Sequence, residues 1–260
     1  MERNVRMKPK MNETLWVIVL GLVMGAVVMI RLTLFQPSAT QQFIRKYAQE
    51  KGISYREYPA SLVELLERNP ETESFVLNYP FRQEIPIDMT AIDRSQGVPL
   101  LLQWDPRWGY DQYGDDFVAN TGCGPLCLSM VGWYLTGDEV FAPDQVIQFA
   151  RDQGYYSKGN GSKWTLISEG GPALGLKVKE LPLVEQKIVD YLKAGNLIIA
   201  VMGPGDFTTT GHYIVLTGYK DGMITVNDPN SLEKSQQLWS YETIESQVRN
   251  LWLVQPGENS

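Results

Sequence analysis

The sequence predicts an α+β fold in which helices come first and an antiparallel sheet follows. Apolar residues recur with helical spacing from about residue 98 to residue 193. After residue 196 the period changes, and short apolar or alternating segments typical of strands take over. Because the two kinds of segment are separated along the chain, we expect helices packed against one antiparallel sheet, with a cleft between the layers.

The first predicted element is a single transmembrane helix. Residues Leu15 to Ile30 contain no charged side chain, and after Arg31 the apolar run resumes through Phe35. At about 1.5 Å per residue, the stretch 15–35 is about 31 Å long, enough to cross the hydrocarbon layer of a lipid bilayer. We therefore expect residues 15–35 to form a membrane anchor.

Basic residues before this anchor predict its orientation. Residues 1–14 carry more basic than acidic side chains, so the positive-inside rule predicts a cytoplasmic basic segment there and an extracellular location for all that follows residue 35. A cleaved signal peptide is the alternative, for which Pro37-Ser38-Ala39 is a poor cleavage site. Gly21 and Gly25 could support a weak helix–helix dimer within the membrane.

Composition restricts the partners of the external part. The chain has 23 basic and 30 acidic residues, of which the first 35 residues hold five and two, so the remainder has a net charge of −10. Such a surface disfavours nucleic acid as a partner. Cys123 and Cys127 lie one helical turn apart, where a disulfide would be strained. With one histidine in addition, they cannot form a zinc cage, and no metal or cofactor is expected.

Residues 36–95 are predicted to form an extracellular stalk or a helical cap on the domain that follows. Helices are expected over Gln41–Lys51, Ser61–Glu67 and Glu71–Leu77, with Ser61 capping the second. The sequence Asn69-Pro70 should end that second helix.

Residues 96–260 are predicted to form the main domain. The stretch Leu126–Leu135 is apolar nearly all round, as a buried central helix would be, and Gly137 should end it. Lys220-Asp221-Gly222 is a strong hairpin signal. The other predicted helices are 143–153, 164–174, 186–193 and 241–248, and the predicted strands are 197–202, 212–219, 223–227 and 251–254.

Cys123 is the candidate nucleophile. It lies in Gly122-Cys123-Gly124-Pro125, at the start of the apolar helix, where the helix dipole and a nearby imidazolium would favour a thiolate. The glycines would allow a substrate backbone to approach closely. An inert core cysteine is the alternative, and it is the expected role of Cys127.

His212, the only histidine of the chain, is the candidate base. It opens a predicted strand after the polar loop 203–211, which could cover a cleft. Asp228 comes at the end of the next strand and would orient the imidazole, although an ordinary turn aspartate is the alternative. The Cys123 amide and Gln103 are candidate donors to an oxyanion, with a surface glutamine as the alternative. Trp164 either lines the cleft or is a core residue.

These motifs resemble the papain-like cysteine peptidases of family C thirty-nine, and more closely its stand-alone relatives, often found in Gram-positive bacteria. The resemblance covers roughly residues 96–255. It rests on the segments 103–108, 113–114, 122–125, 211–219 and 226–229. It implies a papain-like fold, with Cys123 as nucleophile, His212 as base, Asp228 as orienting partner and Gln103 as oxyanion donor.

One departure limits what the resemblance implies about the substrate. The bacteriocin-processing members have a glutamine six residues before the cysteine, work in the cytoplasm and cut leaders after Gly-Gly. Here Phe117 holds that position and the site is expected outside the membrane. Cleavage of Gly-Gly leaders is therefore not implied.

The expected function is that of a membrane-anchored extracellular cysteine peptidase, which hydrolyses a peptide or amide bond of an exterior peptide or protein through a thioester intermediate. One alternative is an acyltransferase of the transglutaminase kind, in which an amine replaces water at the same thioester. The other is a peptide-binding domain that has kept the fold without turnover.

Overall fold

A computed structural model describes residues 13–34, 36–159 and 161–257, and within the first helix it describes the side chains of residues 16–26. The chain divides into two compact units, residues 1–52 and 53–260. The first unit contains the helices α1 (Glu13–Leu34) and α2 (Ala39–Lys51). Ser38 caps the start of α2 by accepting a hydrogen bond from Gln41 N–H, and Gly52, with a φ of 70°, ends it.

Helix α1 covers nearly all of the apolar stretch, residues 15–35, that the sequence predicts to be a membrane anchor. Within the described part of the chain, no helix has both the length and the apolar character needed to span a bilayer. The described side chains of α1 cover only residues 16–26, fewer than the roughly 20 residues that a spanning helix needs. The predicted transmembrane helix over residues 15–35 is therefore not confirmed. Residues 1–12, which make up most of the predicted cytoplasmic basic segment, lie outside the described residues.

The second unit begins with short helices. Helix α3 (Ala60–Arg68) is followed by a 3₁₀ turn, Pro70–Thr72, and by α4 (Glu73–Asn78). The prediction that Ser61 caps α3 is wrong. Pro59 holds the cap position, because its carbonyl accepts the first hydrogen bonds of the helix, from Leu62 and Val63 N–H, and Ser61 lies inside the first turn.

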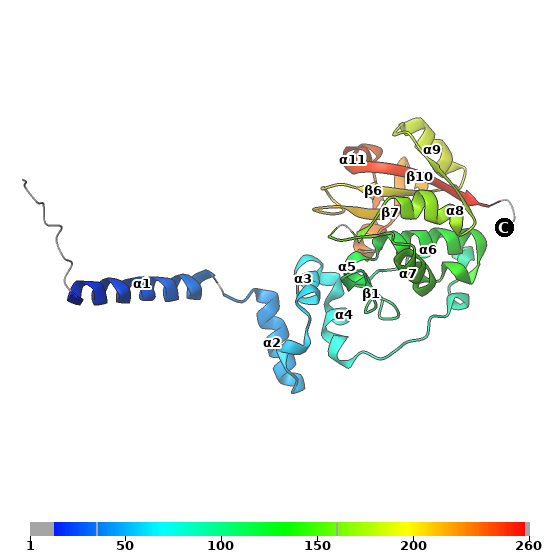
Figure 1. Cartoon of the computed structure of the whole chain (residues 1–260). Helices are drawn as coiled ribbons and strands as arrows, with labels where there is room; N and C mark the ends of the chain where they lie inside the picture. Colours follow the sequence, from blue (N-terminus) through cyan, green and yellow to red (C-terminus); the bar gives the residue numbers. More distant parts are fainter. Residues whose placement is uncertain (1–12, 35, 160, 258–260) are drawn as a thin grey trace, which may run out of the picture. The chain divides into compact units, whose positions relative to one another are not determined.

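A six-stranded antiparallel sheet forms the centre of this unit, in the order β5-β10-β6-β7-β8-β9 (Figure 1). Its strands are β5 (Leu176–Glu180), β6 (Leu197–Met202), β7 (His212–Lys220), β8 (Met223–Asn227), β9 (Leu238–Trp239) and β10 (Val248–Pro256). The mixed helix-and-sheet fold that the sequence predicts is thus confirmed. Lys220 pairs with Met223 across a two-residue turn, in which Asp221 and Gly222 both have positive φ, as this type of hairpin requires.

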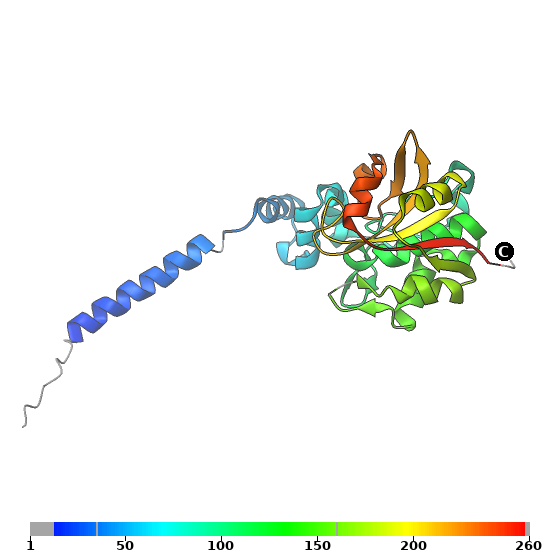
Figure 2. The same ribbon diagram turned by 90° about the horizontal axis from the view of Figure 1, so that it is seen from above.

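Helices cover both faces of the sheet, as Figures 1 and 2 show. Helices α6 (Cys123–Thr136) and α7 (Pro143–Asp152) lie on one side, and α9 (Glu185–Lys193) and α11 (Tyr241–Gln247) lie on the other. Along β6, Ile199 and Val201 pack toward α6, whereas Ile198 and Ala200 pack toward α9 and α11. Every residue of β6 is consequently buried.

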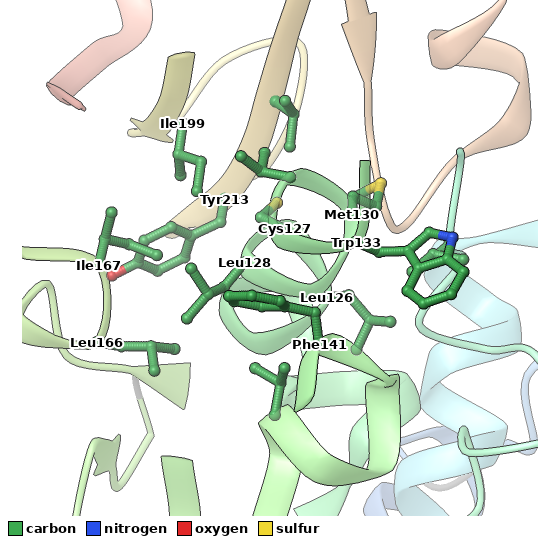
Figure 3. Close-up of a cluster of buried hydrophobic side chains, with 14 of the residues drawn as sticks. Leu126, Cys127, Leu128, Met130, Trp133, Phe141, Leu166, Ile167, Ile199 and Tyr213 are labelled. Carbon is green, nitrogen blue, oxygen red and sulfur yellow. The ribbon is translucent and has the colours of Figure 1, made fainter. Parts of the chain in front are cut away.

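Helix α6 is the buried central helix that the sequence predicts. Its residues from Gly124 to Trp133 are all buried, and Figure 3 shows how its apolar side chains are surrounded by those of neighbouring elements, including Phe141 and Tyr213. A Cβ atom at Gly132 would lie 2.0 Å from the Phe141 ring, so only glycine allows this contact. Gly137, with a φ of 70°, ends the helix as predicted.

The prediction of one continuous α-helix over residues 164–174 is wrong in both the length and the type of helix. The structure has a π-helical turn, Leu166–Gly170, followed by the short α8, Gly171–Ala173. Pro172 cannot donate the backbone hydrogen bond that a continuous α-helix would require. The remaining short elements are β1 (Gln112–Tyr113), β2 (Asp116–Phe117), α5 (Val118–Thr121), β3 (Tyr156–Ser157), β4 (Gly161–Ser162) and α10 (Leu232–Ser235).

Candidate active site

Cys123 is the first residue of α6 and follows a break in helical structure. Helix α5 ends at Thr121, and Gly122 separates it from α6 in a turn conformation. The Cys123 side chain is partly exposed and lines a cavity, whereas Cys127 is fully buried. Both are free cysteines, and burial raises the pKa of the Cys127 thiol well above its ordinary value.

His212 and Asp228 lie together although they come from different strands. His212 opens β7 and Asp228 directly follows β8, and the antiparallel pairing of these strands brings the two side chains together. Nε2 of His212 lies 2.6 Å from Oδ1 of Asp228. His212 is 7% exposed and Asp228 is completely buried, so solvent screens this pair weakly.

The surroundings of His212 favour its charged form. Burial lowers the pKa of the imidazole, but the charge and hydrogen bond of Asp228, together with the hydrogen bond and charge of Cys123, outweigh this effect. The pKa of His212 is raised from 6.5 to about 10. Because Nε2 of His212 is hydrogen-bonded to Asp228, Nδ1 is the ring nitrogen that can interact with Cys123. A cationic imidazole beside a cysteine favours the thiolate, which is the nucleophilic form.

Backbone contacts fix the position of the Asp228 carboxylate. Its Oδ1 also accepts a hydrogen bond from Asn230 N–H at 2.8 Å, and Asp228 N–H donates to Ser235 Oγ at 2.8 Å. Its second oxygen, Oδ2, is buried and has no hydrogen-bond partner among the described residues. The neighbouring Asn227 donates its side-chain amide to the Val98 carbonyl and therefore does not hold the imidazole.

Residues from the predicted stalk or cap segment hold the loop that follows Asp228. Glu71 accepts hydrogen bonds from the Ser231 hydroxyl and from Leu232 N–H, the latter at 2.8 Å. Asn69 donates its side-chain amide to the Asn230 carbonyl at 2.6 Å. The loop that carries the orienting carboxylate is thus attached to a segment about 160 residues earlier in the chain.

Gln103 lies beside the break between α5 and α6. It is 4% exposed, its backbone N–H donates to the Pro229 carbonyl at 2.7 Å, and its side-chain Nε2 donates to the Ala119 carbonyl at 2.5 Å. In an unbroken helix that carbonyl would accept the Cys123 N–H. The Gln103 amide therefore occupies the acceptor that the Cys123 N–H would otherwise use.

The cavity next to Cys123 and His212 has a volume of about 340 Å³. Trp164 and the predicted covering loop contribute to its lining. The lining residues are Cys123, Ser157, Ser162, Lys163, Trp164, Val201, Met202, Gly203, Thr210, Gly211, His212, Tyr213 and Arg249. The structure thus brings Cys123 and His212 to one cavity, with Asp228 behind the imidazole. Gln103 is not among the lining residues, and its side chain contacts the Ala119 carbonyl.

Several residues of this site have no signal in the sequence. Arg249 reaches the cavity because β10 pairs with β6, and Ser162 reaches it through the short β3–β4 pair. No local motif predicts either pairing. Among the described residues, no three His, Cys, Asp or Glu side chains are grouped so that they could hold a metal ion.

Comparison with known proteins gives one family match. Residues 95–258 match the Peptidase_C39 like family. No curated protein matches the chain.

Several solved structures, among them the following three, are similar to part of the chain. The peptidase domain of Streptococcus ComA, a bifunctional ABC transporter involved in a quorum-sensing pathway, is 19% identical with a TM-score of 0.42, over 52% of this chain and 92% of that domain. The same domain of Streptococcus mutans ComA with a small-molecule inhibitor is 18% identical, with a TM-score of 0.36, over 52% and 93%. A protein from Bacillus anthracis described as a C39-like peptidase is 18% identical, with a TM-score of 0.37, over 62% and 96%.

Proposed function

Because this chain belongs to the Peptidase_C39 like family, we propose that it is a cysteine peptidase that uses Cys123, His212 and Asp228. The family match over residues 95–258 confirms the resemblance to family C thirty-nine that the sequence motifs predict. The observation that supports the assignment of roles is the buried His212–Asp228 contact of 2.6 Å next to a partly exposed Cys123 that lines a cavity.

The first half of the reaction forms a thioester. The Cys123 thiolate attacks the carbonyl carbon of a peptide bond, and the carbonyl oxygen takes up the negative charge. The carbon–nitrogen bond then breaks, and Nδ1 of the His212 imidazolium gives its proton to the departing amine. Asp228 keeps the ring oriented and stabilises its positive charge throughout.

The second half of the reaction returns the enzyme to its starting state. His212, now neutral, takes a proton from water, and the oxygen of that water attacks the thioester carbon. The carbon–sulfur bond breaks, the peptide acid leaves, and Cys123 is again a thiolate beside an imidazolium. An amine in place of water would give acyl transfer instead of hydrolysis.

The Cys123 N–H is the first proposed donor to the oxyanion. It lies at the start of α6, after the break at Gly122, and its helical acceptor at Ala119 is engaged by Gln103. Gln103 is the second proposed donor, because its Nε2 carries another N–H beyond the one on Ala119. Its contact with Ala119 supports an additional role, that of keeping the Cys123 N–H available.

Membrane anchoring through residues 15–35, with the catalytic domain outside the cell, is a proposal that rests on the sequence alone. Its support is the uncharged run Leu15–Ile30 with basic residues before it. A peptide or protein outside the membrane would then be the substrate.

The decisive experiment is selective labelling of the nucleophile in the full chain. Iodoacetamide should label Cys123 and spare Cys127, because Cys127 is completely buried and its pKa is raised. Cys123→Ala should lose hydrolysis of a peptide library while keeping its circular dichroism spectrum, and Cys127→Ala is the matched control. Labelling of Cys127 in preference to Cys123, or full hydrolysis by Cys123→Ala, would overturn the proposal.

A further inference from the structure

Arg249 places a positive charge in the proposed catalytic cavity. It lies near the start of β10, is exposed, and lines the cavity together with Cys123 and His212. Among the described residues, Arg249 forms no salt bridge. Lys163 adds a second positive charge to the lining, and no aspartate or glutamate belongs to it. The cavity is therefore cationic in a chain whose formal net charge is −7.

The protein holds the Arg249 side chain against a glycine. A Cβ atom added to Gly203 would lie 2.3 Å from Nε of Arg249, so the guanidinium rests on the bare backbone of Gly203. Gly203 N–H donates to the Gln247 carbonyl at 2.7 Å, which ties the end of β6 to the start of β10. The Gln247 side chain is in turn fixed by Asp206 N–H at 2.6 Å. The contacts around Gly203 and Gln247 thus hold the Arg249 guanidinium in place at the cavity.

A guanidinium that has no acidic partner in a substrate cavity preferentially binds a carboxylate of the ligand. Its planar set of N–H donors matches the two oxygens of a carboxylate, and such charge-assisted hydrogen bonds are stronger than neutral ones. Lys163 is less available for this role, because its Nζ donates to the Gly154 carbonyl at 2.8 Å.

We propose that Arg249 makes this cavity select peptides that carry a carboxylate close to the bond that is cut. This inference rests on the proposed peptidase function of the same cavity. An acidic side chain, Glu or Asp, and the free carboxylate at a peptide C-terminus share the required chemistry.

Matched peptide pools distinguish the two possible sources of the carboxylate, an acidic side chain and a free C-terminus. Short peptides with acetylated and amidated ends are randomised except for one central residue, which is Glu in the first pool and Gln in the second. The peptides of a third pool also have an acetylated N-terminus and Gln at that position, but they stop at this Gln, whose α-carboxylate is free. We expect the full chain to cleave the first or the third pool about 10- to 100-fold faster than the second, the faster pool identifying the source. Cleavage of all three at one rate overturns the inference and leaves the peptidase proposal intact.

Binding to the inactive Cys123→Ala chain tests the inference without hydrolysis. Fluorescent versions of the Glu and Gln pools should differ in affinity by about tenfold or more, measured by anisotropy, if the acidic side chain is the source, and the third pool reports the free carboxylate in the same way. A preference for either carboxylate pool here, combined with no hydrolysis by the unmodified chain, would support carboxylate selection and refute the peptidase. Equal binding of the three pools, or no binding, overturns the selection.

Two variants connect the preference to Arg249. Arg249→Gln removes the charge, and Gly203→Ala displaces the guanidinium while leaving the charge in the chain. Both should bring the ratio of carboxylate to Gln cleavage close to one. Lys179→Gln is the matched control, because Lys179 is an exposed cation on β5 outside the cavity, and it should keep the ratio of the unmodified chain. Retention of that ratio by Arg249→Gln would contradict the proposal.

Discussion

Nε2 of His212 lies 2.6 Å from Oδ1 of Asp228, and this contact couples the charge of a buried imidazole to a buried carboxylate. Two properties of the site depend on it. The contact fixes which ring nitrogen faces Cys123, and it offsets the cost of burying a positive charge next to that cysteine.

We predict that Asp228→Ala lowers turnover by about 10²- to 10⁴-fold, and by less than His212→Ala does. The first variant loses orientation of the base, whereas the second loses the base itself. Asp228→Asn should retain part of the activity, because an amide oxygen still accepts the Nε2 hydrogen bond.

Steady-state turnover of a cleaved library peptide measures these effects. Asp221→Asn is the matched control, because Asp221 is an exposed aspartate at the hairpin turn between the same two strands and asparagine tolerates its positive φ. In a Cys123→Ala background, Asp228→Ala should change nothing further. Undiminished turnover in Asp228→Ala would reduce Asp228 to a turn residue.

The raised pKa of His212 predicts how stability depends on pH. Its folded-state pKa of about 10 lies above the ordinary histidine value of 6.5, so the stabilisation that it contributes is fully present below pH 6.5. This contribution is lost as the pH rises from 6.5 through about 10, at up to about 1.4 kcal/mol per pH unit.

Urea unfolding of the unmodified chain and of Asp228→Asn at several pH values between 6 and 10 checks this prediction. Taking the difference between the two chains removes the titrations that they share. The difference in unfolding free energy should shrink with rising pH, and a difference that stays constant across this window would contradict the raised pKa.

Glu71 should affect catalysis although it lies outside the cavity. Its carboxylate accepts hydrogen bonds from the Ser231 hydroxyl and from Leu232 and Glu233 N–H, and so holds the loop after Asp228. We expect Glu71→Ala to destabilise the domain by about 1–2 kcal/mol and to lower turnover severalfold, with faster hydrogen exchange over residues 228–235.

Glu64→Gln is the matched control for this prediction, since Glu64 is an exposed residue on α3. It should change neither turnover nor exchange. Normal turnover and unchanged exchange in Glu71→Ala would show that the loop after Asp228 does not depend on the earlier segment.

The sequence predicts those parts of the fold and site that have local or periodic signals. The predicted bounds of β6 and β8 match the structure, because β6 is apolar throughout and β8 follows a two-residue hairpin turn. The site motifs are also local: Cys123 lies between two glycines, and the structure places Asp228 beside His212 because their strands are neighbours.

The remaining parts depend on long-range pairing. Strand β5 has only two apolar residues, Leu176 and Val178, so its alternation is too short to predict a strand. It belongs to the sheet because β10 pairs with it. Glu71 and Arg249 reach the site only after distant segments of the chain have come together. No pattern within a short window encodes such contacts.

Membrane attachment is predicted from the N-terminal sequence. The full chain should stay in the membrane fraction after an alkaline wash, with its domain open to external protease, because the run Leu15–Ile30 is uncharged and basic residues precede it. A chain that begins at residue 36 is the matched control and should be found in the soluble fraction. Recovery of a soluble natural form that begins near Thr40 would instead identify a cleaved signal peptide.

Gln103→Ala should separate transition-state stabilisation from thiol reactivity. Removing the side-chain amide frees the Ala119 carbonyl, which the Cys123 N–H can then use as its helical acceptor, and it also removes the second proposed oxyanion donor. Both effects withdraw hydrogen bonds from the oxyanion, so kcat should fall by about 10²- to 10³-fold with little change in KM. The His212–Asp228 contact does not involve Gln103, so the rate at which iodoacetamide alkylates Cys123 should change little. Slower hydrogen exchange at the Cys123 amide in the variant would show that Gln103 positions this N–H. An unchanged kcat would show that Gln103 neither donates to the oxyanion nor positions the N–H that does.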